Sequence, residues 1–408
     1  MQRLEAAAKN SPLTGHLMSK PSHSDRLADI DLESIAAYAD GAPHAQFRRL
    51  RREAPVFWHE RPGGTAFWAV TRWAETRAVL SEPETHSSAS SGVSLTDPPP
   101  GALPMLRAML PFQDPPVHVA TRKRVLPSFA RRQAIALEGS IRGWATQLID
   151  RALALGECDF VASIASELPA RVITHLLGLP SEDGPLLRDW TDRVTEGDVA
   201  GGVTALNAYL EEAVRTQRAS GTQGELVARI GSATEPDAVA RMLSQIVQGG
   251  TETMRSLLSC SLLELLEHPD QLALLRREPQ RIPDGVEEML RIVSPVHHLR
   301  RTATRDTELG GQQIGIGERV VVFLASANRD EAIHRDPDRF DVARRPQRHL
   351  ALGYAQHFCV GAHFARLEAR VFWEEFLARV KSVELTGSAL RVRSNQQNSL
   401  SQLPVRLR

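Results

Sequence analysis

The sequence predicts a mainly α-helical fold with small β-sheets. Apolar residues recur at helical spacing in most segments, for example at positions 257, 258, 262, 265 and 266. Strand-like runs are few and short. One helical pattern, from Thr234 to His268, is far longer than the average helix of a globular protein. Together these observations favour a helical core with β-structure at its margin.

Length and composition favour one large domain. The chain has 408 residues, of which 42% are hydrophobic, enough to bury a large core. That length ordinarily suggests more than one domain, yet no repeat or interdomain linker stands out. Basic and acidic residues balance at 49 each, which argues against a nucleic-acid partner or an anionic membrane surface.

The cysteines and the N-terminus indicate a cytoplasmic protein. Cys158, Cys260 and Cys359 are widely spaced and odd in number, which argues against disulfides or structural zinc. No segment approaches the roughly 18 apolar residues of a membrane span. The first 25 residues lack an apolar core, so we expect a flexible tail and no membrane anchor.

Two segments have the composition of β-hairpins. Residues 56–59 and 66–70 are rich in aromatic and β-branched side chains, and Pro62-Gly63-Gly64 lies between them. Residues 309–323 carry several glycines among β-branched residues and predict a second hairpin.

Residues 86–116, which we call the lid segment, form the one long stretch rich in Ser, Pro and Gly. A loop of this length in a compact domain is usually a lid or binding loop, or else disordered. Its apolar side chains, available for burial, are Leu95, Leu103, Met105, Leu106 and Leu110. They favour the lid over a mobile surface excursion.

The long helix predicted from Thr234 ends at His268, before Pro269. Gly249 and Gly250 lie in its middle, where each costs about 1 kcal/mol relative to alanine. This cost predicts that another group approaches the backbone there.

Glu252 and Thr253 follow the two glycines directly. A carboxylate beside a hydroxyl suits proton relay or the binding of a water molecule. The alternative is a helix kink with a solvated glutamate, but the apolar character of the surrounding helix argues against it.

Cys359 lies in residues 357–361, a short loop before the amphipathic run 362–377. A sulfur at a helix start faces unpaired backbone N–H groups and the positive end of the helix dipole, which favour a thiolate. Gly353 and Gly361 bracket it and let backbone pass close to a flat ligand. The alternative is a buried, inert cysteine. The setting favours a haem-thiolate loop.

Other polar residues form pairs at helical spacing. Glu288 and Arg291 are three apart, and His118 and Arg122 are four apart, while Arg301 follows in an extended stretch. Each of these alone is more often an exposed surface residue. Their order along the chain changes that interpretation.

Taken in order, these motifs resemble the cytochrome P-450 family. The order is a Glu-Thr helix, an E-x-x-R helix, an R-x-A strand, residues 327–330 (Ala-Asn-Arg-Asp), Phe340-Asp341 with Arg344, and His-x-Cys-x-Gly. The likeness runs from about residue 26 to the C-terminus. It implies a flexible tail over residues 1–25 and one large, triangular haem-thiolate domain over residues 26–408.

The resemblance also implies roles for individual residues. Cys359 becomes the axial thiolate of heme b (iron protoporphyrin IX), and Gly250, Glu252 and Thr253 match the oxygen-binding groove. The haem propionates are assigned to His118, Arg122, Arg301 and His357, and the ligand loop to Leu352, Gly353 and Gly361. The buried ion network behind the haem is assigned to Glu288, Arg291 and Arg344, with Arg339 competing for the third position.

Two positions depart from the family pattern. Leu352 stands where the loop normally begins with an aromatic residue, and Ala355 replaces a glycine four residues before the cysteine. Both changes alter packing beside the thiolate, so we expect a shifted haem potential. Leu352→Phe should change the midpoint potential. Met254 also replaces a frequently hydroxylic neighbour of Thr253.

The implied activity is a monooxygenase that inserts one atom of dioxygen into a hydrophobic small molecule. A lipid, steroid, terpenoid or polyketide-like substrate fits, and a separate ferredoxin with its NAD(P)H-dependent reductase would supply electrons. Alternatives within the same family are peroxygenase, coupling or dehydration chemistry. An alternative from a different class is a haem-based sensor or carrier that catalyses no reaction. Residues 181–215 and 396–400 and the lid segment are expected to form the substrate pocket. Its candidate residues are Leu95, Gln245, Gln248, Gly249, Val296, His297, His298, Leu299 and Asn398.

Overall fold

The structure is a computed structural model that describes residues 27–60, 63–221, 224–231, 235–345 and 348–408. The chain divides into two units, residues 1–30 and residues 31–408. In the first unit the amide of Ile30 donates to the carbonyl of Leu27 at 3.2 Å. The predicted tail over residues 1–25 lies outside the described residues.

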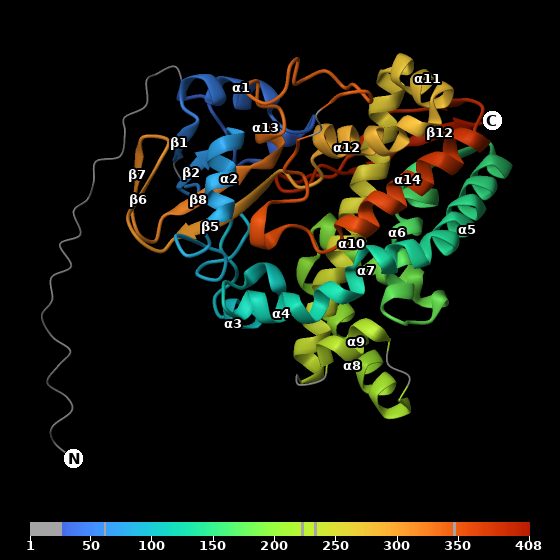
Figure 1. The fold of residues 1–408 in the computed structure, drawn as a ribbon, viewed down its shortest axis with the longest axis horizontal. Coiled ribbons are helices and arrows are strands. Elements are labelled where there is room, and N and C mark those ends of the chain that lie inside the picture. The colour runs from blue at the N-terminus through green and yellow to red at the C-terminus, as the bar shows by residue number, and fades with distance from the viewer. Residues whose placement is uncertain (1–26, 61–62, 222–223, 232–234, 346–347) are drawn as a thin grey trace, which may run out of the picture. The chain divides into compact units, whose positions relative to one another are not determined.

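Helices dominate residues 31–408 (Figure 1). The α-helices are α1 (His44–Glu53), α2 (Trp73–Ser81), α3 (Leu103–Leu106), α4 (Val117–Val125), α5 (Arg131–Leu155), α6 (Glu167–Leu176), α7 (Gly184–Glu196), α8 (Val199–Ser220), α9 (Glu225–Gly231), α10 (Pro236–Glu267), α11 (Pro269–Arg277), α12 (Ile282–Val293), α13 (Leu324–Ala327) and α14 (Ala362–Arg379). The other helical turns are η2 (Ile35–Tyr38), η3 (Leu110–Phe112), η4 (Leu126–Phe129), η5 (Val161–Ala165), η6 (Ser181–Asp183), η7 (Pro279–Arg281) and η8 (Ala355–His357). Among the described helices, none combines the length and apolarity of a bilayer span.

Twelve short strands form four small sheets in the described chain. They are β1 (Val56–His59), β2 (Phe67–Val70), β3 (His86–Ser87), β4 (Glu157–Asp159), β5 (His298–Ala303), β6 (Thr307–Leu309), β7 (Gln312–Ile314), β8 (Arg319–Phe323), β9 (Val383–Leu385), β10 (Leu390–Arg391), β11 (Leu400–Gln402) and β12 (Pro404–Leu407). The largest sheet has the order β1-β2-β8-β5-β3, and the others are β4-β12-β9, β6-β7 and β10-β11. The fold is therefore mainly α with small sheets, as predicted.

The first predicted hairpin is confirmed, and the second is partly wrong. Strands β1 and β2 pair antiparallel, with Val56 opposite Val70. The second hairpin joins β6 to β7 across Gly310 and Gly311, both at positive φ. Strand β8 leaves that hairpin and pairs parallel with β2 and antiparallel with β5. It is apolar and buried over residues 320–323, as expected of a central strand that has a neighbour on each edge and packing on both faces.

The main core lies among the helices (Figure 1), where α14 runs beside α5 and α10 passes through the same cluster. The rings of Phe372, Trp373 and Phe376 on α14 are fully buried there. Helix α12 adds Met289 and Leu290 from its apolar face. This packing holds α10, α12 and α14 in fixed relation, and these helices carry most of the polar motifs.

Helix α10 runs from Pro236 to Glu267 without a break. Glu235 is its N-cap residue, and Thr234, the predicted start, lies outside the described residues. Its C-cap is His268, after which Pro269 begins α11. The two central glycines therefore do not interrupt the helix.

The lid segment is ordered into short pieces that bury part of their apolar surface. Leu95 and Leu110 are buried, whereas Met105 is 56% exposed on α3. The backbone of the lid segment is hydrogen-bonded to β5, since the amide N–H of Arg300 donates to the carbonyl of Val93 at 2.8 Å. The segment thus packs against the sheet.

Candidate active site

A cavity lies where α4, α6, α10, the loop before α14 and α14 itself approach one another. The cavity has a volume of about 320 Å³. Its wall is mostly apolar. The polar side chains on the wall belong to Arg122, Gln245, Thr253, Arg301, His357, Cys359 and Glu368.

Backbone hydrogen bonds position Cys359 at the start of α14. Its amide donates to the carbonyl of Leu352 at 2.8 Å, so the loop folds back on itself. Gly353 has a φ of +73°, and a Cβ there would lie 3.3 Å from the carbonyl oxygen of His357. Gly361 is the N-cap of α14. Gly353 is therefore needed for its close backbone turn, whereas Gly361 has a φ of −81°, which other residues also adopt.

Ala355 adopts a conformation that normally favours glycine. Its φ is +53°, in the left-handed region, where a Cβ costs about 1–2 kcal/mol. The residue is exposed on η8, so the strain is in the backbone and not in packing. The departure from glycine noted in the sequence therefore places strain four residues from Cys359.

The electrostatic setting of Cys359 has opposing parts. The residue is partly open to the cavity, yet protein surrounds its sulfur, and this burial raises the pKa of the thiol. The N–H of Gly361 and the charges of Arg122 and Arg366 lower that pKa, by a smaller amount. The sequence argument favoured the helix start over burial, whereas in the structure burial has the larger effect on this pKa. A metal ion on the sulfur would reverse the balance, because a coordinating thiol is deprotonated outright.

Three side chains of the predicted propionate site, those of Arg122, Arg301 and His357, line one part of the cavity. Arg122 donates to the carbonyl of Phe358 at 2.6 Å, and Arg301 to the carbonyl of Arg300 at 2.8 Å. Within the described chain, Arg301 has no carboxylate within ion-pair distance, although it is only 4% exposed. The ring of His118 packs against that of His357, with ring centroids 4.0 Å apart and planes tilted by 37°.

This group of cations fits an anionic ligand. Burial lowers the pKa of Arg301 to about 10. Burial, and then the charges of Arg301, His118 and Arg122, lower the pKa of His357 to about 2. Both ring nitrogens of His118 are buried without a hydrogen-bond partner in the described structure. Two carboxylates would neutralise the arginines and accept from the rings, which is what haem propionates offer.

The middle of α10 forms another wall of the cavity. Gly249, Gly250 and Thr253 all line it. A Cβ on Gly250 would lie 2.5 Å from Cδ1 of Ile173 on α6, so the approaching group predicted from the sequence is this side chain. Thr253 Oγ1 donates to the carbonyl of Gly249 at 2.6 Å and remains at the cavity surface.

Glu252 does not line the cavity. Its carboxylate is only 5% exposed and pairs with Arg255, which also pairs with Asp192 on α7. Arg255 and Asp192 line a second cavity of about 300 Å³. Neighbours on a helix point about 100° apart, so the acid and the alcohol of the predicted pair face different spaces. The sequence analysis missed Arg255, one turn further along α10.

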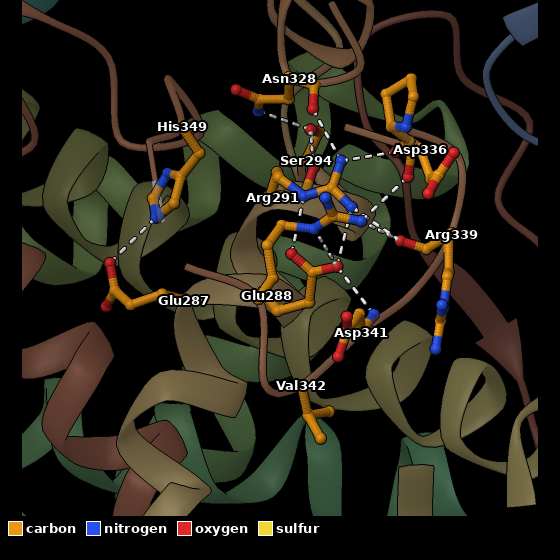
Figure 2. Close-up of polar contacts among 12 residues, drawn as sticks. Glu287, Glu288, Arg291, Ser294, Asn328, Asp336, Arg339, Asp341, Val342 and His349 are labelled. Carbon is orange, nitrogen blue, oxygen red and sulfur yellow. Dashed lines mark hydrogen bonds and ion pairs between the residues drawn. The ribbon is translucent and has the colours of Figure 1, made fainter. Parts of the chain in front are cut away.

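The predicted ion network is assembled around Glu288 (Figure 2). Arg291 donates to it at 2.7 and 2.8 Å, and Arg344 donates at 3.1 Å. Arg291 is 1% exposed and also donates to the carbonyls of Asn328, Pro337 and Arg339. Arg344 therefore occupies the third position, and Arg339 contributes only its carbonyl.

Four of the predicted substrate-pocket residues line the cavity, and five do not. Gln245, Gly249, Val296 and Leu299 form part of the wall. The five that do not are Leu95, Gln248, His297, His298 and Asn398. The lid segment contributes Val93, Leu110 and Pro111 instead.

The reasons for these corrections are local. On β5 the side chains alternate, so Leu299 reaches the cavity while His298 packs against Phe323, with ring centroids 5.6 Å apart. The ring of His297 packs against that of Tyr38, with ring centroids 5.1 Å apart. The two amide side chains, Gln248 and Asn398, are held away from the cavity by hydrogen bonds. Gln248 donates to Ser244 on its own helix, and Asn398 donates to the carbonyl of Val293.

Glu368 on α14 was missed by the sequence analysis. It lines the cavity, is 2% exposed, and its Oε1 has no hydrogen-bond partner in the described structure. Burial raises the pKa of this carboxyl from 4.5 to about 8. Its place nine residues after Cys359, on the same helix face as other core residues, is a weak signal that sequence alone does not separate from a surface glutamate.

Glu368→Gln should change how stability depends on pH. The unfolded chain releases this proton near pH 4.5 and the folded chain near pH 8, so native stability falls as pH rises through that window. The variant lacks this loss, and its free energy of unfolding relative to the native protein should increase by up to about 1.4 kcal/mol per pH unit. Denaturant midpoints of the haem-loaded proteins at pH 5, 6, 7 and 8 measure it. Glu212→Gln, at an exposed position on α8, controls for the removal of charge; equal profiles for both variants and the native protein would refute the expectation.

Comparison with known proteins agrees with the cavity and its cysteine. The fold is mainly helical, a cysteine precedes its last long helix, and cationic side chains line the cavity beside that cysteine. These features are those of a haem-thiolate protein. Residues 215–406 match the family described as Cytochrome P450. The chain is 35% identical to linalool 8-monooxygenase of Pseudomonas putida over 92% of this chain and 98% of that one. It is 33% identical to steroid C26-monooxygenase of Mycobacterium tuberculosis over 92% and 96%.

Solved structures agree with these relatives. A cytochrome P450 of Mycobacterium marinum in complex with pseudoionone superposes with a TM-score of 0.86 at 30% identity, over 95% of this chain and 99% of that one. Cytochrome P450-153 from Novosphingobium aromaticivorans has a TM-score of 0.85, also at 30% identity, over 93% and 99%. The chain therefore belongs to the cytochrome P450 family, a family of haem-binding oxidoreductases.

Proposed function

We propose that this protein is a monooxygenase that inserts one atom of dioxygen into a hydrophobic small molecule. The observation that carries the proposal is a single cavity that brings together Cys359, the cations Arg122 and Arg301, and the hydroxyl of Thr253. The names of the monooxygenase relatives support the same reaction type.

In this proposal the wall residues hold the haem. Cys359 would be the iron ligand, while His118, Arg122, Arg301 and His357 would hold the propionates, with Gly353 and Gly361 shaping the loop. When bound, haem iron supplies the activation of dioxygen. Glu288, Arg291 and Arg344 would keep the segment between β8 and the ligand loop in place, because their bonds tie residues 328–341 to α12.

The substrate would occupy the apolar part of the cavity. Val296 and Leu299 approach from the β5 side, and Leu110 approaches from the lid segment. Such a wall recognises shape and apolar area, which suits a lipid, steroid, terpenoid or polyketide-like molecule. Closing the cavity with the lid segment would also exclude water from the reacting centre.

Proton delivery is assigned to two residues with separate tasks. Thr253 would hold a water molecule at the cavity, because its hydroxyl donates to the carbonyl of Gly249 and keeps two acceptor lone pairs for a donor. Glu252 would collect protons from the second cavity through the polar groups of Arg255 and Asp192. For Glu252 to reach Thr253, its ion pair with Arg255 has to open.

Thr253→Ala should uncouple electron use from product. The loss of the hydroxyl removes a hydrogen-bonding group at the cavity, so product per dioxygen consumed should fall by about tenfold or more. Thr251→Ala is the matched control, since Thr251 also donates to a carbonyl four residues back but does not line the cavity. Unchanged coupling in Thr253→Ala would remove this residue from the proposal.

Electrons are proposed to come from a ferredoxin and its NAD(P)H-dependent reductase. Phe358, next to Cys359 in the sequence, is 37% exposed and offers an apolar contact at the surface. The test is reconstitution of the haem-loaded protein with such a pair and a panel of hydrophobic ligands chosen by their effect on the haem spin state. We expect NAD(P)H consumption linked to an oxygenated product; turnover with peroxide alone and none with the electron-transfer pair would contradict the proposal.

A further inference from the structure

We propose that Gln245 determines specificity by binding an uncharged oxygen of the substrate, a hydroxyl or a carbonyl, away from the carbon that reacts. This inference rests on the proposed function and adds a chemical feature to its substrate. The feature is an amide that faces the cavity and makes no hydrogen bond with another described residue.

The position of Gln245 on α10 sets the distance to the reacting end. Gln245, Gly249 and Thr253 are spaced by four residues and line one cavity. Eight residues of helix rise by roughly 12 Å, so the backbones of Gln245 and Thr253 are about two turns apart, and the Thr253 hydroxyl reaches back to the carbonyl of Gly249 between them. Gly249 has no side chain between them, and a Cβ there would lie 3.4 Å from Nε2 of Gln245.

Two other glutamine side chains in the described structure, unlike Gln245, have hydrogen-bond partners. Gln248, one turn along on the same helix, donates to the carbonyl and hydroxyl of Ser244. Gln217 donates to the carbonyls of Leu177 and Gly178. Gln245 instead presents two donors and an acceptor oxygen to the cavity, and an apolar ligand covering them would leave them unpaired.

The other polar groups of the wall have tasks within the proposed function. Arg122, Arg301 and His357 are assigned to the haem, and Thr253 to proton delivery. The rest of the wall is mostly apolar and includes Ile246 on the same helix and Leu176 on α6. A carboxylate placed there would have a neutral amide as its partner, which does not compensate for the loss of hydration. The expected group is therefore an uncharged oxygen.

Matched ligands separate the role of the amide from general apolar binding. The probes are primary alcohols from octanol to tetradecanol, with the alkane and the fatty acid of each length. Their dissociation constants are measured from the haem spin-state change in the native protein, Gln245→Leu and Gln248→Leu. Gln245→Met is a second replacement, of nearly the same length, in case leucine disturbs folding.

The ratio of alcohol to alkane affinity decides the outcome. Both Gln245 variants should shift that ratio toward the alkane by about tenfold, while Gln248→Leu leaves it unchanged. An unchanged ratio in the Gln245 variants, tighter binding of the fatty acids than of the alcohols, or the absence of alcohol binding by the native protein would each overturn the inference. The proposed function is judged separately, by NAD(P)H-linked product formation from any ligand of the wider panel.

Discussion

Cys359→Ser should abolish the spectral signature of the haem-thiolate bond and monooxygenase turnover together. A serine hydroxyl is far less acidic than a thiol and donates less electron density to iron, so the oxygen-activating role of the ligand is lost. The measurement is the absorption of the dithionite-reduced, carbon-monoxide-bound protein. We expect a strongly red-shifted Soret band in the native protein and its absence in the variant.

The matched control is Cys158→Ser. Cys158 is half-buried on β4 and does not line the cavity, so this variant should keep both the band and turnover. Retention of the red-shifted band by Cys359→Ser, or its loss in Cys158→Ser, would contradict the assignment of the ligand.

The second large effect is expected for Arg291→Leu. This change removes the main partner of Glu288 and leaves the carbonyls of Asn328 and Pro337 without their donor. Because Glu288 is fully buried and would keep only Arg344 as an ion-pair partner, the change should lower the free energy of unfolding by about 3–5 kcal/mol. Denaturant midpoints of the haem-loaded protein, followed by circular dichroism and Soret absorption, measure the change.

Arg215→Leu provides the comparison on the surface. Arg215 is 57% exposed and pairs with Glu211 on α8, so its loss should cost less than about 1 kcal/mol. Adding Glu288→Leu to Arg291→Leu should recover part of the loss, because the stranded carboxylate is then absent. A cost below 1 kcal/mol for Arg291→Leu would show that the network contributes little to stability.

Features that depend on neighbours in sequence were predicted well. The β1–β2 hairpin follows from a glycine-containing turn between two apolar runs, and the end of α10 follows from Pro269. The parallel pairing of β8 with β2 was not predicted, since it joins residues about 250 positions apart. Residues 319–323 have the same local composition whether they close a hairpin or enter a buried sheet.

The candidate site shows the same division. The ligand loop could be predicted because Cys359, Gly353 and Gly361 lie within nine residues and their geometry is local. The outcome for Gln245 and Gln248 could not, because both are polar residues of one helix and only its rotation against α6 decides which amide reaches the cavity.

By itself, the sequence determined the family, the order of the motifs and the residues at the start of α14, because these depend on residue type and short-range backbone geometry. Only the tertiary structure decided that Glu252 turns to Arg255 and Asp192 while Thr253 faces the cavity. It also decided that Glu368 is a buried carboxyl with a raised pKa. The physical reason is that burial and charge pairing depend on which helices pack together, and that packing joins segments far apart in the chain.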